Sequence, residues 1–229
     1  MFFGDPTFLL AIPALILAFY AQARVKSAYR KYSQVFAASR MTGAQAAHQL
    51  LQAAGAGAVT IERQPGQLTD HYDPRKRVLR LSEGVHDSSS IAALGIAAHE
   101  TGHAIQHHTQ YGPMGLRSLI YPVANLGSGL AFPIFLAGFF FGGKTSTLLM
   151  DIGIVLFAGA VAFTVVTLPV EFNASKRAVA LLEERRFLTG DELVGAKKVL
   201  GAAALTYVAA TASAASQLIR MLVLRSSRD

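Results

Sequence analysis

Three apolar segments are each long enough to cross a lipid bilayer, and they constrain the fold of this 229-residue chain more than any other feature. They are residues 6–23, 119–141 and 148–170, and Asp151 is their one charged residue. At 1.5 Å per residue, roughly 20 helical residues cross the hydrocarbon core of a bilayer. Because 52% of all residues are hydrophobic, we predict a mainly α-helical membrane protein with three or four transmembrane helices.

The charges around the first segment predict an uncleaved anchor with its N-terminus outside the cell. Asp5 precedes the segment, whereas four Lys or Arg residues follow it between positions 24 and 31. Basic residues collect on the cytoplasmic side of a span, and a secretory signal carries its basic residues before the apolar run. A cleaved signal is the alternative, since Ala21–Gln22–Ala23 resembles a cleavage site. Asp5 and Pro6 also form a typical N-cap and first helical position.

The second and third segments predict a membrane hairpin. Only a short linker around Gly142–Gly143–Lys144 joins them, so the chain returns to the side that it left. Basic residues follow the hairpin, as expected for its cytoplasmic end: Lys176, Arg177, Arg185 and Arg186. The net charge of +7 fits such loops, whereas nucleic-acid binding would need a concentrated basic face. We therefore expect a lipid bilayer and no nucleic acid among the partners.

Residues 199–219 are also of spanning length but are built mainly from Ala, Ser and Thr. A fourth span would place Arg220, Arg225 and Arg228 outside, against the usual distribution of basic residues. We therefore favour a cytoplasmic or re-entrant helix for this segment and keep a fourth span as the alternative.

Between the anchor and the hairpin, the pattern changes to that of a small α+β domain. Residues 24–39 continue the first helix, and Thr42 can cap a second helix that ends near Gly55. Val59–Ile61 and Val78–Leu81 are typical of short strands. Ser88–Ser90 can cap a third helix, Ile91 to about His108, which is apolar on several faces and therefore buried.

This third helix carries His99-Glu100-Thr101-Gly102-His103, a His-Glu-x-x-His motif. Residues four apart share one face of a helix, so both imidazoles can bind one Zn²⁺ while Glu100 reaches the water beside it. The chain has no Cys, which excludes disulfides, a cysteine nucleophile and thiolate zinc ligands. The motif therefore predicts a zincin-like domain with a zinc site made of imidazoles and oxygens.

A catalytic zinc site usually has three protein ligands, so one more is needed. The position six residues after His103, where many zinc proteases have a third His, is Thr109. His107 lies one turn beyond His103, where a straight helix carries it past the metal. Glu171 follows the hairpin and is the better candidate, although a charge at the start of an interfacial helix is an equal alternative.

The chain resembles the neutral zinc metallopeptidase family called YugP-like, which is similar to the HtpX-type and CAAX prenyl proteases. The motifs that carry the resemblance are Asp70–Pro74, Leu79–Ser82, Ala97–His107 and Leu168–Ser175. The resemblance extends over nearly the whole chain. It implies a membrane-bound zinc metalloprotease of the gluzincin type, with His99, His103 and Glu171 as ligands of one Zn²⁺ per chain.

The resemblance also implies which residues support the metal ligands. The wider group usually has an Asp four residues after the ligand Glu, where it orients a metal-binding His, but this chain has Ser175. A Ser hydroxyl can accept the same hydrogen bond without supplying a charge. Asn173 in the same motif is a second candidate for a residue that supports the ligands.

The predicted activity is endopeptidase hydrolysis, in which zinc polarises the scissile carbonyl and Glu100 carries a proton from water to the leaving amine. Tyr207 is a candidate oxyanion donor, although a packed core Tyr is the commoner case. Val78–Ser82 is a candidate edge strand to which an extended substrate could add, or else a core strand. Asp151 could suggest ion transport, but one interfacial carboxylate is usually a solvated helix end.

The main alternative from another functional class is a noncatalytic membrane scaffold with a structural metal site. A structural site has no use for a free carboxylate such as Glu100 beside the metal, which favours the enzyme. Intramembrane proteolysis is a second alternative, but the motif helix ends some ten residues before the second span. We therefore expect an active site at the cytoplasmic surface of the plasma membrane, acting on peptides or proteins, membrane proteins included. The sequence predicts no particular oligomeric state.

Together these inferences divide the chain into four parts. Residues 6–23 form a transmembrane anchor, 24–118 the cytoplasmic zincin-like domain, and 119–170 the transmembrane hairpin. Residues 171–229 form a C-terminal helical part that completes the active site.

The orientation can be tested with reporter fusions in the polar segment 64–76, which the charge pattern places in the cytoplasm. A green fluorescent protein inserted there should fluoresce, whereas alkaline phosphatase at the same position should be inactive. Active phosphatase in this segment would reverse the predicted orientation.

Overall fold

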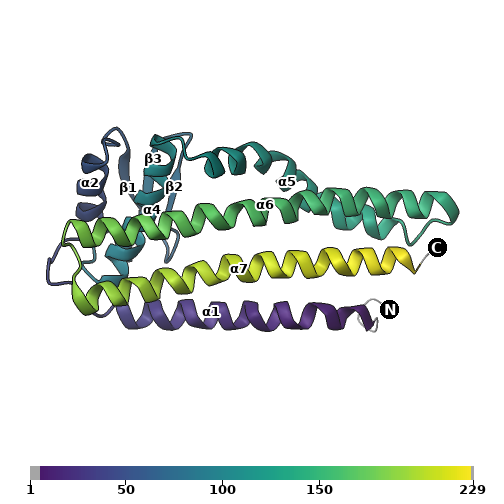
Figure 1. Cartoon of the computed structure of the whole chain (residues 1–229), viewed down its shortest axis with the longest axis horizontal. Coiled ribbons are helices and arrows are strands. Elements are labelled where there is room, and N and C mark those ends of the chain that lie inside the picture. The colour runs from purple at the N-terminus through teal and green to yellow at the C-terminus, as the bar shows by residue number, and fades with distance from the viewer. Residues whose placement is uncertain (1–5, 228–229) are drawn as a thin grey trace. The chain divides into compact units, whose positions relative to one another are not determined.

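The computed structural model describes residues 6–227, which are mainly helical and include one small sheet (Figure 1). Asp5 and Arg228 lie outside the described residues. The helices are η1 (Pro6–Ala11, a 3-10 helix), α1 (Ile12–Tyr32), α2 (Gly43–Ala53), α3 (Glu83–His86), α4 (Ile91–His108), α5 (Gly112–Ala137), α6 (Gly143–Glu184) and α7 (Gly190–Ser226). The strands are β1 (Thr60–Gln64), β2 (His71–Asp73) and β3 (Val78–Ser82). The predicted fold class, mainly helical with a small α+β part, is confirmed to this extent.

The chain forms two compact units. Unit 1 contains the stretch up to Ala21, Gly115–Pro169 and the stretch from Thr206 onward, and unit 2 contains Gln22–Met114 and Val170–Leu205. Among residues 6–227, four helical stretches are long and apolar enough to cross a membrane: Pro6–Tyr32, Gly112–Ala137, Gly143–Glu184 and Gly190–Ser226. Each of the four contributes to unit 1.

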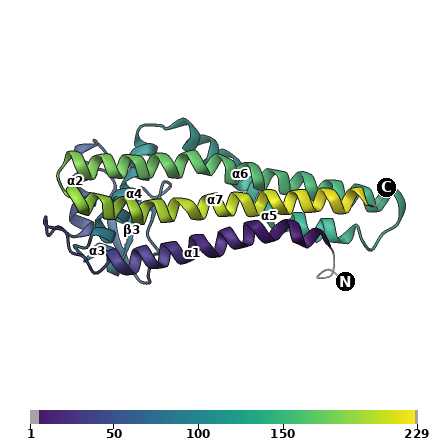
Figure 2. The same cartoon turned by 60° about the horizontal axis from the view of Figure 1, so that its bottom comes forward.

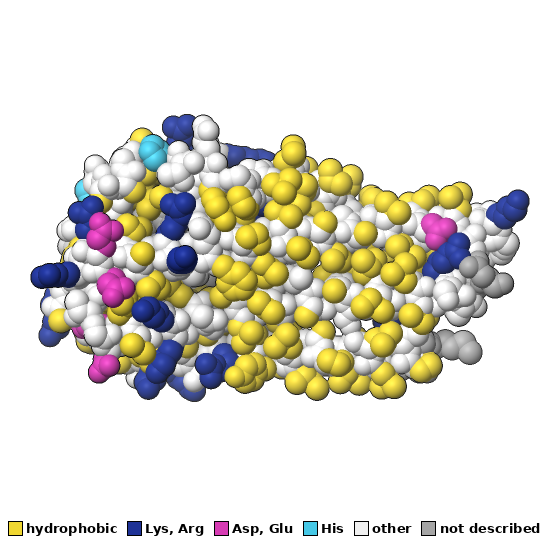
Figure 3. All heavy atoms as spheres, in the orientation of Figure 1, with side chains coloured by type: hydrophobic (Ala, Val, Ile, Leu, Met, Phe, Trp, Pro, Cys, Tyr) yellow, Lys and Arg dark blue, Asp and Glu magenta, His cyan; other side chains and the backbone are white. Residues whose placement is uncertain are grey.

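The helices of unit 1 present large apolar side chains on their outer surface (Figure 3). Phe19, Leu119, Val123 and Val155 are each between 67% and 74% exposed. A soluble monomer rarely exposes a contiguous apolar surface of this extent, whereas helices in contact with lipid require one. Unit 1 therefore has the surface expected of a membrane-spanning bundle.

Polar contacts join the C-terminal part of α7 to its neighbours within unit 1. The Nε atom of Arg225 donates to Oδ1 of Asp151 on α6 at 2.8 Å. Nearer the middle of the helix, Nε of Arg220 donates to Oγ1 of Thr7 at 3.2 Å. The segment 199–219 is therefore not a separate helix but the middle of α7, one continuous helix of 37 residues.

Unit 2 is built in layers around α4. The sheet has the order β1-β3-β2, with β1 parallel and β2 antiparallel to β3. The helices α2 and α4 lie beside the sheet in both views (Figures 1 and 2), and one hydrophobic cluster joins all three. A second cluster packs the opposite side of α2 and α4 against residues 178–200 of α6 and α7 and the loop between them. The helix that carries the His-Glu-x-x-His motif is therefore enclosed on two sides, as its apolar composition predicts.

The sequence predicts the starts of both helices in this core correctly. Thr42 caps α2 in a capping box with Gln45, in which each side chain accepts a hydrogen bond from the backbone of the other. Ser90 caps α4 by accepting from the backbone N–H of Ala93 at 3.2 Å. These bonds satisfy N–H groups that the first turn of a helix leaves without an intrahelical partner.

Of the two alternatives for Val78–Ser82, the edge strand is wrong and the core strand is confirmed. This segment is β3, the central strand, and four of its five residues are buried. The edges of the sheet are β1 and β2, and β2 lies inside the turn-rich stretch where the sequence predicts no strand. Its three residues are too few to produce a detectable alternation of apolar and polar side chains.

Two predicted helix boundaries are also wrong. The first helix ends at Tyr32 and does not continue to residue 39. The helix that holds Glu171 does not begin there, because α6 runs without interruption from Gly143 to Glu184 with Pro169 inside it. Proline usually kinks or ends a helix, which is why the sequence suggests a new start directly after it.

A close crossing of α4 and α6 holds unit 2 together at the level of the motif. A Cβ atom at Gly102 would lie 2.8 Å from the carbonyl oxygen of Ala174, closer than real Cβ contacts allow. The two backbones therefore approach each other at a point where only glycine fits on α4. This approach brings the start of the unit 2 part of α6 beside the motif.

We predict that Gly102→Ala destabilises the protein by about 1–3 kcal/mol, because the added methyl group overpacks this crossing. The matched control is Gly95→Ala on the same helix, where the new Cβ would lie 3.6 Å from Cβ of Ala196, an ordinary contact. Alanine is a better helix former than glycine, so the control should be at least as stable as the wild type. Thermal unfolding in detergent measures both, and equal melting temperatures for the two variants would contradict the crossing.

Candidate metal centre

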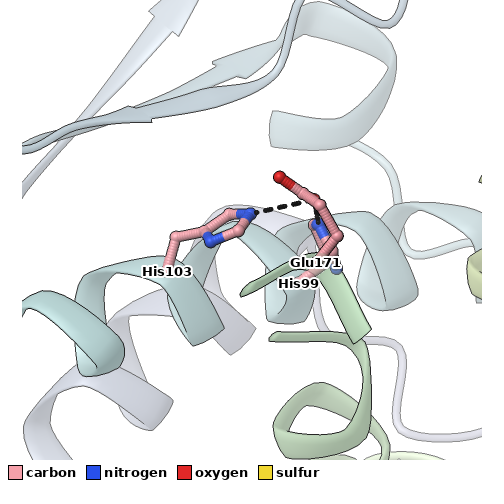
Figure 4. A group of neighbouring side chains, drawn as sticks. All are labelled: His99, His103 and Glu171. Atoms are coloured by element: carbon pink, nitrogen blue, oxygen red, sulfur yellow. Dashed lines mark ion pairs between the residues drawn. The ribbon is translucent and has the colours of Figure 1, made fainter. Parts of the chain in front are cut away.

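Three side chains from two helices of unit 2 converge on one point (Figure 4). His99 and His103 lie one turn apart on α4, with ring centroids 4.8 Å apart. Glu171 reaches them from α6, and its Oε2 lies 3.3 Å from Nε2 of His99 and 3.4 Å from Nε2 of His103. One potential ligand atom from each residue lies within 4.8 Å of the other two, so the group could hold a metal ion.

The separations between these atoms fit a zinc site. Ligand bonds of about 2.0–2.1 Å in a tetrahedral arrangement put neighbouring ligand atoms roughly 3.3–3.4 Å apart. The two imidazole-carboxylate separations are 3.3 Å and 3.4 Å. Two nitrogens and one oxygen are also a usual donor set for catalytic zinc, and three ligands leave a fourth position for water.

The site is buried and carries opposing charges. Glu171 is 2% exposed and His103 is 8% exposed. Burial disfavours a charged imidazole, but the negative charges of Glu171, whose Oε2 lies 3.4 Å from Nε2, and of Glu100 outweigh it, so the pKa of His103 is raised. A buried carboxylate is costly unless positive charge lies beside it. The residues present therefore suit a bound cation.

Gln106 fixes which nitrogen of His103 faces the centre. Its Nε2 donates to the carbonyl oxygen of Val170 at 2.8 Å and to Oδ1 of Asn173 at 3.0 Å. These two acceptors orient the amide so that its Oε1 points to Nδ1 of His103, 2.9 Å away. Nδ1 must then donate a proton to Oε1, which leaves the lone pair of Nε2 free to bind a metal.

The structure also places both residues that the sequence suggests as supports for the ligands. Oγ of Ser175 lies 3.1 Å from Nδ1 of His99, where it can accept a hydrogen bond and hold Nε2 toward the centre. Asn173 contacts no ligand directly but acts through Gln106, and its Oδ1 also accepts from Nε of Arg177 at 2.8 Å.

Glu100 is half-buried and belongs to none of these ligand contacts. Its negative charge raises the pKa of His103 and that of Asp70, which places its carboxylate near both groups. The pKa of Asp70 is raised mainly by burial, and its Oδ1 accepts hydrogen bonds from the backbone N–H and the hydroxyl of Ser82 at the end of β3. A carboxylate beside the centre, held out of the ligand set, can carry a proton.

Two further candidate residues, His107 and Tyr207, lie outside the ligand group. His107 is not a ligand in this group, and its Nδ1 forms a hydrogen bond with the hydroxyl of Tyr72 at 2.8 Å. Tyr207 belongs to α7 in unit 1, and its role as an oxyanion donor stays a prediction. Sequence reasoning missed Gln106, although a polar amide three residues after His103 in a buried helix is a signal that could have shown it.

Comparisons with known proteins relate this chain to zinc metallopeptidases and to a membrane protease. A model of the family described as "Putative neutral zinc metallopeptidase" matches residues 7–226. The chain is 48% identical over 221 residues to "Putative membrane protease YugP" of Bacillus subtilis (strain 168), an alignment that covers 96% of this chain and 97% of that protein. No solved structure matches the chain.

We predict that Gln106→Leu weakens metal binding roughly 10–100-fold, because Nδ1 of His103 loses its acceptor and the ring its fixed orientation. The matched control is Gln52→Leu, an exposed position on α2. Metal content after dialysis against graded chelator concentrations measures the change. Equal metal retention in both variants would show that Gln106 does not orient the ligand.

Proposed function

Because the chain belongs to the family of neutral zinc metallopeptidases, we propose that it is a membrane-embedded zinc endopeptidase of the gluzincin type. The observation that carries the proposal is the convergence of His99, His103 and Glu171 on one point, with Glu100 beside it. Family membership alone gives a reaction class, whereas this arrangement gives each residue a role.

The proposed ligands are Nε2 of His99, Nε2 of His103 and a carboxylate oxygen of Glu171. When bound there, zinc supplies Lewis-acid polarisation of the scissile carbonyl and of the attacking water. The protein's own part is to orient Nε2 of each imidazole toward the centre, which Ser175 and Gln106 do by accepting a hydrogen bond from Nδ1 on the far side of each ring.

Glu100 moves the proton that hydrolysis requires. Its carboxylate accepts a proton from the attacking water as the new carbon–oxygen bond forms. It then delivers this proton to the nitrogen of the scissile amide as the carbon–nitrogen bond breaks, so that an amine leaves. The carboxylate ends in its starting state, ready for the next turnover.

For the membrane arrangement, we propose four spans with the metal centre on the cytoplasmic side of the plasma membrane. The continuity of α7 and its contacts with α6 and η1 in unit 1 support a fourth span over the re-entrant helix that the charges favour. Arg225 would then lie outside, but its bond to Asp151 lowers the cost of that placement. The substrates are peptides or proteins that reach the membrane surface, membrane proteins included.

A noncatalytic scaffold with a structural metal is the alternative from another class. Such a protein would bind zinc equally well, so metal content alone cannot separate the two. The carboxylate of Glu100 distinguishes the enzyme from the scaffold, because only the enzyme needs it to transfer a proton.

We predict that Glu100→Gln keeps about one zinc per chain but loses at least about 100-fold in the rate of cleavage, since the amide cannot accept the proton. Glu171→Ala should lose the metal itself. The control is Glu184→Gln at the exposed end of α6. Zinc analysis and cleavage of labelled casein measure the two effects, and full cleavage by Glu100→Gln would reject the mechanism.

A further inference from the structure

His107 continues the row of imidazoles on α4 beyond the metal centre. It follows His103 by four residues, as His103 follows His99, so the three rings lie on neighbouring parts of one helix face. Yet the group that could hold a metal consists of His99, His103 and Glu171 without it. A half-buried imidazole one turn from a metal centre therefore has no role in the mechanism proposed above.

The sheet holds this imidazole in place. The hydroxyl of Tyr72 lies 2.8 Å from Nδ1 of His107, and the two ring centroids are 5.8 Å apart. Tyr72 is the middle residue of β2, an edge strand of the sheet. Both side chains are half-buried, so part of each is exposed at the surface.

The hydrogen bond allows a tautomer of His107 with its proton on Nε2. Burial raises the pKa of Tyr72 above its usual value, so its hydroxyl is protonated at neutral pH and can donate to Nδ1. A neutral imidazole that accepts at Nδ1 carries its own proton at Nε2. Within residues 6–227, no hydrogen bond engages Nε2 of His107. In the tautomer that accepts from Tyr72 at Nδ1, Nε2 of His107 is therefore an oriented N–H donor.

The distance to the metal centre decides what this donor can bind. One helical turn is about 5.4 Å, and an extended peptide advances about 3.3 Å per residue. A peptide that runs along α4 with its scissile carbonyl at the metal would therefore pass His107 one to two residues further along. The donor meets the backbone beside the scissile bond and not the reacting carbonyl.

We propose that Tyr72 and His107 form a substrate subsite, in which Nε2–H of His107 donates to a backbone carbonyl of the peptide next to the bond that is cleaved. The partner is an extended polypeptide and not a free amino acid, because a single residue at the metal cannot reach the donor. This inference rests on the proposed function, since it takes the metal centre as the position of the scissile bond.

The alternative is that the hydrogen bond between Tyr72 and His107 only stabilises the packing of β2 against α4. Two kinds of metal-binding probe distinguish a substrate subsite from a purely structural contact. Acetohydroxamate binds zinc and extends no further, whereas a tripeptide hydroxamate binds zinc and also carries peptide groups past the centre. Two tripeptide hydroxamates are used, one that extends in each direction from the zinc-binding group.

The experiment measures the affinity of the zinc-loaded full chain in detergent for all three probes by calorimetry. We expect His107→Leu and Tyr72→Phe to bind one tripeptide hydroxamate about 3–10-fold more weakly, with unchanged affinity for acetohydroxamate and unchanged zinc content. His108→Leu, an exposed neighbour at the end of α4, should bind all three probes as the wild type does.

Three results would overturn the subsite. Unchanged affinity for both tripeptide hydroxamates would show that the pair does not touch peptide. Equal losses for all probes, together with loss of zinc, would show a purely structural contact that only supports the metal centre. Wild-type protein that binds zinc but no hydroxamate would remove the proposed catalytic site and the subsite with it.

Discussion

The pairing of the buried carboxylate of Glu171 with the imidazoles of His99 and His103 is the interaction on which the functional part of the structure depends. A carboxylate that is 2% exposed is tolerated only beside positive charge. Two helices must meet closely to create this pairing, which explains a glycine at the crossing of α4 and α6. The same helices carry the groups that orient the ligands, so packing and chemistry cannot be changed independently.

Support for the two imidazoles comes from different sources. His99 has a hydroxyl from Ser175, whereas His103 has an amide, Gln106, that is itself fixed by Val170 and Asn173. Neither partner carries a charge. A charged partner raises the basicity of a ligand more than a neutral one, so the positive charge of a bound zinc ion is balanced mainly by Glu171.

Much of unit 2 could be predicted from the sequence because its signals are local. Thr42 and Ser90 cap helices through bonds within three residues, and the motif spacing puts His99 and His103 on one face. Features that depend on distant pairing could not be predicted. The central position of β3 follows from partners on both sides, and the support of His103 by Gln106 depends on a carbonyl 64 residues away. For Glu171, only the resemblance to a known family favoured a ligand over an interfacial charge.

The central claim is that His99, His103 and Glu171 hold one zinc ion. X-ray absorption at the zinc edge of the purified, zinc-loaded protein tests it most directly. The account predicts two imidazole nitrogens and oxygen ligands at about 2.0–2.1 Å in a four-coordinate site. A spectrum without imidazole scattering, or one of six oxygen ligands, would contradict it.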